Sequence, residues 1–169
     1  MENTNSPVQK VSNFLFFSKN SAIIWLIVRF YVGYQWFMAG WEKLGTSVWT
    51  GSGAGTAIQG FLNGALAKAG GAHADVLTWY AWLISHVFIP CAPALSYIVT
   101  FGELLVGVAL ILGIFTGFAA GIGAFMNFNY LFAGTVSINP LLLLLQIFII
   151  KGSKVAGWFG VERFTQKKG

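Results

Sequence analysis

The stretch PALSYIVTFGELLVGVALILGI, residues 93–114, decides the fold class of this chain, because it is long and apolar and its one charged residue is Glu103. A helix needs about 20 consecutive apolar residues to cross a bilayer, and this stretch supplies them. A membrane-barrel strand would instead alternate apolar and polar residues over about 10 positions. The apolar run here is continuous, so the stretch predicts a transmembrane helix.

The composition of the whole chain agrees with a bilayer location. Of its 169 residues, 56% are hydrophobic and 9% are charged, whereas a typical soluble domain has about 25% charged residues. The mean hydropathy is +0.71. The one cysteine, Cys91, excludes a disulfide scaffold and a dithiol redox centre. The net charge of +5 comes mainly from residues near the two chain ends, which favours lipid headgroups over nucleic acid as the partner.

Three more apolar stretches lie outward from this one, at residues 22–41, 116–134 and 138–150. The last is short for a straight crossing, so it needs flanking residues or a thinned bilayer. The expected fold is therefore all-α, a polytopic four-transmembrane-helix bundle. Residues 22–164 would form this membrane domain.

The two ends of the chain are expected to be tails on the cytoplasmic side, an N-terminal one at residues 1–21 and a basic C-terminal one at 165–169. Lysine and arginine are enriched on the cytoplasmic side of membrane proteins. Two basic residues, Lys43 and Lys68, flank the opposite face. Those that flank the cytoplasmic face are Lys10, Lys19, Lys151, Lys154, Arg163, Lys167 and Lys168. The prediction is a multi-pass protein of the cytoplasmic membrane with both termini inside.

The longest non-spanning segment, residues 44–92, is expected on the outer face. It contains a predicted amphipathic helix at residues 57–69 and an aromatic helix at 76–89 that ends at Pro90. Tryptophan and tyrosine favour the membrane interface. The aromatic helix is therefore interpreted as interfacial or as a re-entrant lid, and the sequence leaves both open.

Ionisable residues inside the spans carry the strongest functional signal, because each is costly unless it is paired. Arg29 and Glu103 qualify. Measured from the cytoplasmic ends of their helices, their depths are roughly 12 and 16 Å, so we expect them to meet as a buried pair. Such a pair is either a structural clamp or a group that binds a polar ligand or relays protons. Asn127 lies at a similar depth and is expected to join this pair or to form an interhelical hydrogen bond.

The outer end of the first span is also rich in charged and aromatic side chains. Residues 39–44, AGWEKL, bring Trp41, Glu42 and Lys43 together, and Trp36 lies one and a half turns before Trp41. These residues are interpreted either as an interfacial belt or as the mouth of a ligand site that Trp36 and Trp41 shape.

Signatures of bound cofactors are missing from the sequence. His73 and His86 both lie outside the spans, which argues against a membrane haem. His86 and Cys91 are too few for a metal site. The glycine-rich residues 51–55 follow no strand, so they predict a loop rather than a nucleotide site. No haem, metal or flavin is therefore expected, and no catalytic residue can be named.

Five sequence motifs together resemble the DoxX/DoxD family, and the likeness is greatest to DoxD. They extend over most of the chain. The motifs are RFYVG at residues 29–33, GWEKL at 40–44, FGELLVG at 101–107, LGIFTG at 112–117 and NFNYLFAGTVSINP at 127–140.

The resemblance implies a membrane subunit of a thiosulfate:quinone oxidoreductase, in which electrons from thiosulfate reach membrane quinone. Quinone would be the substrate, and a DoxA-like subunit a partner. The recurrent polar positions of the family fall on Arg29, Glu42, Lys43, Glu103 and Asn127. With Trp36 and Trp41 these are the candidate substrate-binding residues, and Arg29 and Glu103 are expected to hold the quinone headgroup.

Two other classes of function remain open. The chain could be a non-catalytic membrane scaffold that docks a soluble oxidoreductase, with the charged pair as a clamp. It could also be a small-solute permease, although the sequence shows no inverted repeat and no pair of broken helices. A homodimer also stays open, because four spans enclose a complete site only narrowly.

Overall fold

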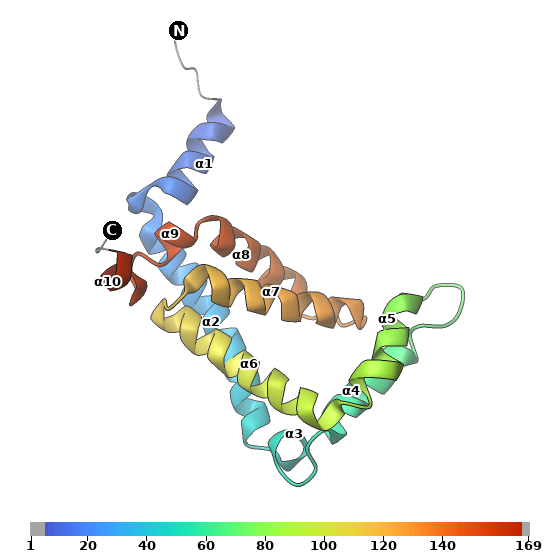
Figure 1. Ribbon diagram of the computed structural model, residues 1–169. Coiled ribbons are helices and arrows are strands. Elements are labelled where there is room, and N and C mark those ends of the chain that lie inside the picture. Colours follow the sequence, from blue (N-terminus) through green and yellow to red (C-terminus); the bar gives the residue numbers. More distant parts are fainter. Residues whose placement is uncertain (1–5, 167–169) are drawn as a thin grey trace.

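The computed structural model describes residues 6–166, which form helices and turns and contain no β-strand (Figure 1). Of the predicted basic C-terminal tail, residues 167–169 lie outside this part. The elements in chain order are α1 (Pro7–Phe17), the 3₁₀ turn η1 (Lys19–Ser21), α2 (Ala22–Leu44), α3 (Ser47–Thr50), α4 (Thr56–Leu66), α5 (Thr78–Leu83), the π-helical turn η2 (Ile84–Phe88), α6 (Ala92–Leu112), α7 (Thr116–Phe132), α8 (Asn139–Lys151), α9 (Ser153–Ala156) and α10 (Glu162–Gln166).

The four apolar stretches of the sequence correspond to α2, α6, α7 and α8. Two helices, Lys19–Leu44 and Ala92–Leu112, are long and apolar enough to cross a membrane. Helix α8 is apolar but shorter. The protein is therefore all-helical with two candidate membrane-spanning helices.

Glycines bring α2 and α6 into close contact. A Cβ atom on Gly107 would collide with the backbone of Phe37. On α2, a Cβ on Gly40 would lie 2.8 Å from the Leu104 backbone nitrogen, and one on Gly33 would lie 3.0 Å from the Gly107 carbonyl oxygen. Small residues permit such close backbone approach. These contacts fix the antiparallel register, in which Gly33 faces the C-terminal part of α6 and Gly40 faces its middle.

Helices α7 and α8 form a hairpin whose two arms run side by side (Figure 1). Helix α7 also contacts α6, and α8 contacts α2. Aromatic and aliphatic side chains from all four helices fill the space between them. This first core includes Trp25, Trp36, Leu110, Ala120 and Ile149.

The predicted N-terminal tail contains a well-defined helix, α1. Its start is encoded by a capping box, in which Ser6 and Gln9 exchange side-chain-to-backbone hydrogen bonds, with Pro7 in the first turn. Near its end Phe16 is buried against Trp25, with ring centroids 5.5 Å apart. Residues 7–17 are therefore a folded element attached to the bundle.

The predicted outer segment has its own small core. Helix α4 matches the predicted helix at residues 57–69, and α5 with η2 matches the one at 76–89. Their buried side chains include Ile58, Leu62 and Ile84.

This outer core packs onto the ends of α6 and α7. The Tyr80 hydroxyl donates a hydrogen bond to the Asn129 carbonyl at 3.0 Å, and Lys68 Nζ donates one to the Gly134 carbonyl at 2.8 Å. Burial raises the pKa of Tyr80 to about 12, so its hydroxyl keeps the proton that it donates. The outer segment is thus fastened to the far end of the α7–α8 hairpin.

Candidate functional site

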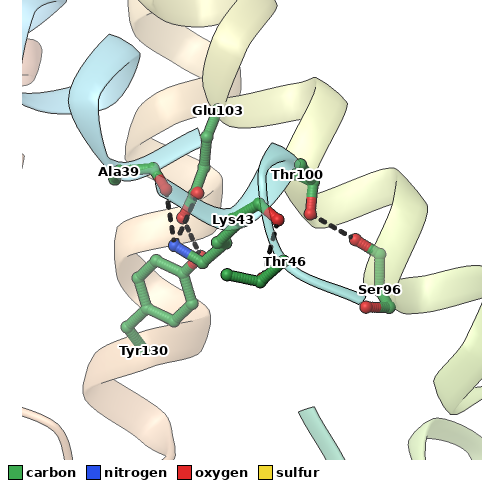
Figure 2. A network of polar contacts seen from close by, with 7 residues as sticks. All are labelled: Ala39, Lys43, Thr46, Ser96, Thr100, Glu103 and Tyr130. Carbon is green, nitrogen blue, oxygen red and sulfur yellow. Dashed lines mark hydrogen bonds and ion pairs between the residues drawn. The ribbon is translucent and has the colours of Figure 1, made fainter. Parts of the chain in front are cut away.

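A buried carboxylate is the centre of the first polar site, which we call the outer polar cluster (Ala39, Lys43, Glu103 and Tyr130; Figure 2). Glu103 Oε2 lies 2.7 Å from Lys43 Nζ and forms an ion pair with it. The Tyr130 hydroxyl donates a hydrogen bond to Glu103 Oε1, also at 2.7 Å. Lys43 Nζ donates a second bond to the Ala39 carbonyl at 3.2 Å. Helices α2, α6 and α7 thus meet at one side chain.

Burial differs between the two charged members of the cluster. The Glu103 side chain is 2% exposed, whereas the Lys43 side chain is 20% exposed. Both carboxylate oxygens have partners within the protein. The ammonium has three donor hydrogens and two described acceptors, so Lys43 is the member that can donate to a ligand.

Hydrogen bonds hold the loop after α2 next to Lys43. The Thr46 hydroxyl donates to the Lys43 carbonyl at 2.9 Å (Figure 2), and the Ser96 hydroxyl of α6 donates to the Trp49 carbonyl at 2.7 Å. The Trp49 ring centroid lies 5.1 Å from Lys43 Nζ, which is a cation–π distance. Helix α3 therefore forms one wall of the outer polar cluster.

Aromatic rings separate the outer polar cluster from a second polar group. Tyr130 stacks on Trp36 with centroids 6.4 Å apart and meets the edge of Phe61 from α4 at 6.0 Å. With the Gln146 side-chain amide turned so that its oxygen faces Trp36, the Trp36 indole nitrogen donates to that oxygen at 2.7 Å. The buried amides of Gln146 and Asn127 are in hydrogen-bond contact at 2.6 Å.

This amide group confirms one of the two interpretations of Asn127. It links α7 to α8 by a hydrogen bond and does not join Glu103. The sequence analysis assigned no role to Gln146 or Tyr130. The signal for Gln146 was available, because it is the one polar residue in the apolar run at residues 140–150. Tyr130 gave no comparable signal, since tyrosine is common at helix ends in membrane proteins.

The expected pair of Arg29 and Glu103 is wrong, because Glu103 pairs with Lys43. The depth argument assumed that the start of α2 and the end of α6 lie level at one membrane surface. The register set by Gly40 instead places Glu103 beside the last turns of α2. Arg29 is 14 residues before Lys43, so the two lie roughly 21 Å apart along the helix axis.

Arg29 belongs to a second site at the other end of α2, the inner polar cluster (Arg29, Gly113, Thr116, Phe159 and Glu162). Its guanidinium is 1% exposed and donates to the Phe159 carbonyl at 3.1 Å. Glu162 interacts with it electrostatically and accepts a hydrogen bond from the Thr116 backbone nitrogen at 3.3 Å. The C-terminal segment therefore folds over the buried arginine, a contact that local sequence patterns do not reveal.

The remaining candidate residues lie apart from both clusters. Trp41 is exposed and stacks on Phe37 with centroids 5.8 Å apart, and Glu42 is also exposed. Of the predicted mouth residues, Lys43 thus pairs with Glu103 and Trp36 is buried beside Tyr130, whereas Trp41 and Glu42 lie on the surface. Within residues 6–166 no group of three histidine, cysteine or acidic side chains is placed to hold a metal ion.

Three comparisons with known proteins gave no match. No family model, no curated protein and no solved structure matches the chain. The geometry nevertheless brings the five sequence motifs together in two places. The segments at residues 40–44, 101–107 and 127–140 supply the charged and phenolic side chains of the outer polar cluster. Those at 29–33 and 112–117 supply Arg29, Gly113 and Thr116 of the inner one, whose other members come from the C-terminal segment.

Proposed function

We propose that this protein is a multi-pass subunit of the cytoplasmic membrane that binds a quinone headgroup at the outer polar cluster. The observation that carries the proposal is the Glu103 carboxylate, which is buried in the helix bundle and held there by Lys43 and Tyr130. Buried ionisable groups in such surroundings are typical of functional sites. The proposed role is in a redox complex that reduces quinone to quinol.

The membrane location is supported by the outer surface of the helices. Two helices have the required length and hydropathy. Exposed large apolar side chains cover the outside of α2, α6, α7 and α8, and a water-soluble protein rarely exposes so many. They include Ile27, Phe30, Ile98, Leu105, Phe118, Phe125, Leu144 and Ile147. In the proposal all four helices cross, and the basic end with α1 and α9 faces the cytoplasm.

The chemistry of the outer polar cluster suits a quinone carbonyl, which is a hydrogen-bond acceptor. Lys43 Nζ has donor capacity and partial exposure, and Trp49 and Phe61 offer flat apolar walls. Reduction to quinol takes up two electrons and two protons. Lys43 would supply one proton at a carbonyl oxygen and would be reprotonated from water on its exposed side, and water there would supply the second proton, with Glu103 holding the ammonium in place. The electrons would come from a partner subunit.

The electron donor is the part of the proposal that rests on the resemblance to DoxX/DoxD proteins alone. It would be a reduced sulfur compound such as thiosulfate, oxidised by a DoxA-like or other oxidoreductase subunit. The outer polar cluster lies at the end of the bundle opposite α9. We therefore place the contact with that subunit on the outer face, next to α3 and α4.

A specific observation also favours the scaffold as a second candidate function. Both Glu103 oxygens are already satisfied by Lys43 and Tyr130, as a purely structural clamp between three helices requires. In that case the protein would dock an oxidoreductase without binding quinone. The two candidates differ in whether quinone occupies the protein.

The test is to purify the protein in nanodiscs, extract it with organic solvent and quantify bound isoprenoid quinone. We expect about one quinone per site in the wild type, a loss in Lys43→Gln, which removes the ammonium, and a reduced content in Tyr130→Phe, which removes the hydroxyl that holds Glu103. Lys68→Gln is the matched control, since it removes an outer lysine that bonds only a loop carbonyl in the described structure.

Folding of each variant is checked by circular dichroism and by elution as a single species. Quinone retained at the wild-type level in a folded Lys43→Gln protein, or absent from every sample, would replace the quinone site with the scaffold. Loss in the Lys68→Gln control as well would show that the effect is not specific to the outer polar cluster.

A further inference from the structure

Helix α1 is encoded as a helix yet leaves most of its apolar side chains uncovered. The capping box at Ser6 and Gln9 starts it, so its formation does not depend on packing alone. Val8 is 77% exposed and Phe17 is 70% exposed. Val11 and Phe14 are exposed as well. Their three-residue spacing places Val8, Val11 and Phe14 along one side of the helix.

The other end of α1 is held firmly, which fixes the direction in which the exposed side points. Phe16 packs against Trp25 at 5.5 Å and Phe148 at 6.1 Å, measured between ring centroids. The Leu15 carbonyl accepts hydrogen bonds from Trp25 Nε1 at 2.6 Å and from the Ser21 hydroxyl at 2.8 Å. Figure 1 shows α1 projecting beyond the bundle and lying across the direction of α7 and α8. The apolar side of α1 is therefore held in a fixed orientation relative to the bundle and lies on the surface of the protein.

Basic side chains gather around the end of α1 that joins the bundle. Lys19 and Arg163 both lie over the Trp158 ring, at 4.1 and 5.2 Å from its centroid, and Lys151 lies 4.4 Å from that of Phe16. These contacts join the chain before α2 to the segment after α9. Lys10 is exposed on α1, and Lys154 is exposed on α9. These basic residues form a rim at and beside the packed end of α1, and this basic rim is complementary to anionic phosphates.

We propose that α1 is a membrane-surface helix that binds the anionic cytoplasmic leaflet, with Val8, Val11 and Phe14 among the acyl chains and the basic rim at the lipid phosphates. An amphipathic helix with cations beside its apolar face lies in the interface plane, and anionic lipids add an attraction for each basic residue. This inference rests on the membrane location in the proposed function, but not on quinone binding.

The test places single spin labels on the full-length protein in a Cys91→Ser background, reconstituted into vesicles of equal parts phosphatidylcholine and phosphatidylglycerol. Labels replace Val11 and Phe14 on the apolar side and Asn13 on the polar side of α1. A fourth label replaces Leu105, which is exposed on α6. The measurement is collision with oxygen, which partitions into acyl chains, and with a water-soluble nickel chelate.

We expect Val11 and Phe14 to favour oxygen, and Asn13 to favour nickel. Nickel access at Val11 and Phe14 would overturn the inference, because those positions would face water. Low access to both reagents would also overturn it, because a second protein chain would then cover α1. Loss of oxygen access at Leu105 would instead contradict the membrane location itself, so the two failures are distinguishable.

The role of anionic lipid is tested in vesicles of phosphatidylcholine alone. We expect the preference of Val11 and Phe14 for oxygen to fall there, while that of Leu105 stays the same. An unchanged preference at all three positions would overturn the recognition of anionic lipid.

Discussion

The Glu103 carboxylate shows how one residue can connect three helices. It comes from α6, its ion-pair partner Lys43 from α2 and its hydrogen-bond partner Tyr130 from α7. Leaving a buried charge without its partner costs more free energy of folding than the intact ion pair contributes to stability. The geometry of the outer polar cluster is therefore constrained whether or not a ligand binds.

At this scale we expect Lys43→Met to lower the free energy of unfolding by roughly 3–5 kcal/mol, because it leaves the Glu103 carboxylate uncompensated. The double variant Lys43→Met/Glu103→Met should recover most of that loss. Equilibrium unfolding in mixed micelles of the wild type, the two single variants and the double variant gives the four free energies of a double-mutant cycle. Strictly additive effects of the two substitutions would contradict a direct interaction between these side chains.

At the scale of elements, the contact between α2 and α6 decides which residues can meet. It uses glycine on both helices, at Gly33 and Gly40 and at Gly107. Because the backbones touch at these points, the helices cannot slide past one another without a clash. The sequence analysis assigned both helices correctly, but it paired Arg29 with Glu103, since hydropathy gives the length of a helix and not its register against another.

The glycine contact predicts opposite effects of two alanine substitutions. Gly107→Ala should destabilise the protein by about 1–3 kcal/mol, because its new methyl group would meet the Phe37 backbone. Gly64→Ala in α4 has open space around it and should stabilise by up to about 1 kcal/mol through helix propensity. The readout is thermal unfolding in identical nanodiscs, and a shift of both variants in the same direction would contradict the proposed helix contact.

At the scale of the whole molecule, the helices separate two chemically different ends. One end carries α1, α9 and the basic rim, with the inner polar cluster beneath the C-terminal segment. The other carries α3, α4 and α5 with the outer core and the exposed Cys91. This separation is the physical basis for the orientation in the proposed function.

The orientation predicts which side of the membrane each end occupies. In intact cells a membrane-impermeant maleimide should label the natural Cys91, because it is exposed at the outer end. A Lys154→Cys substitution in a Cys91→Ser background should react only after the membrane is permeabilised. Labelling of both positions from the same side would rule out the proposed crossing.

The sequence by itself determined the helices and their apolar character. Runs of apolar residues predict the helices α2, α6, α7 and α8, and the high mean hydropathy of the chain favours an apolar surrounding. The sequence also identified Arg29 and Glu103 as buried charges, which is confirmed. These properties are local, because each depends on residues within a few turns of one another.

Only the tertiary structure decided the partners of those charges. Lys43 and Glu103 are 60 residues apart, and Arg29 and Phe159 are 130 apart. Their meeting depends on how far α2 is shifted against α6 and on the fold of the C-terminal segment over α2. Helix register is set by side-chain volume at a few contact points, above all at the glycines, and such complementarity exists only once the helices are packed.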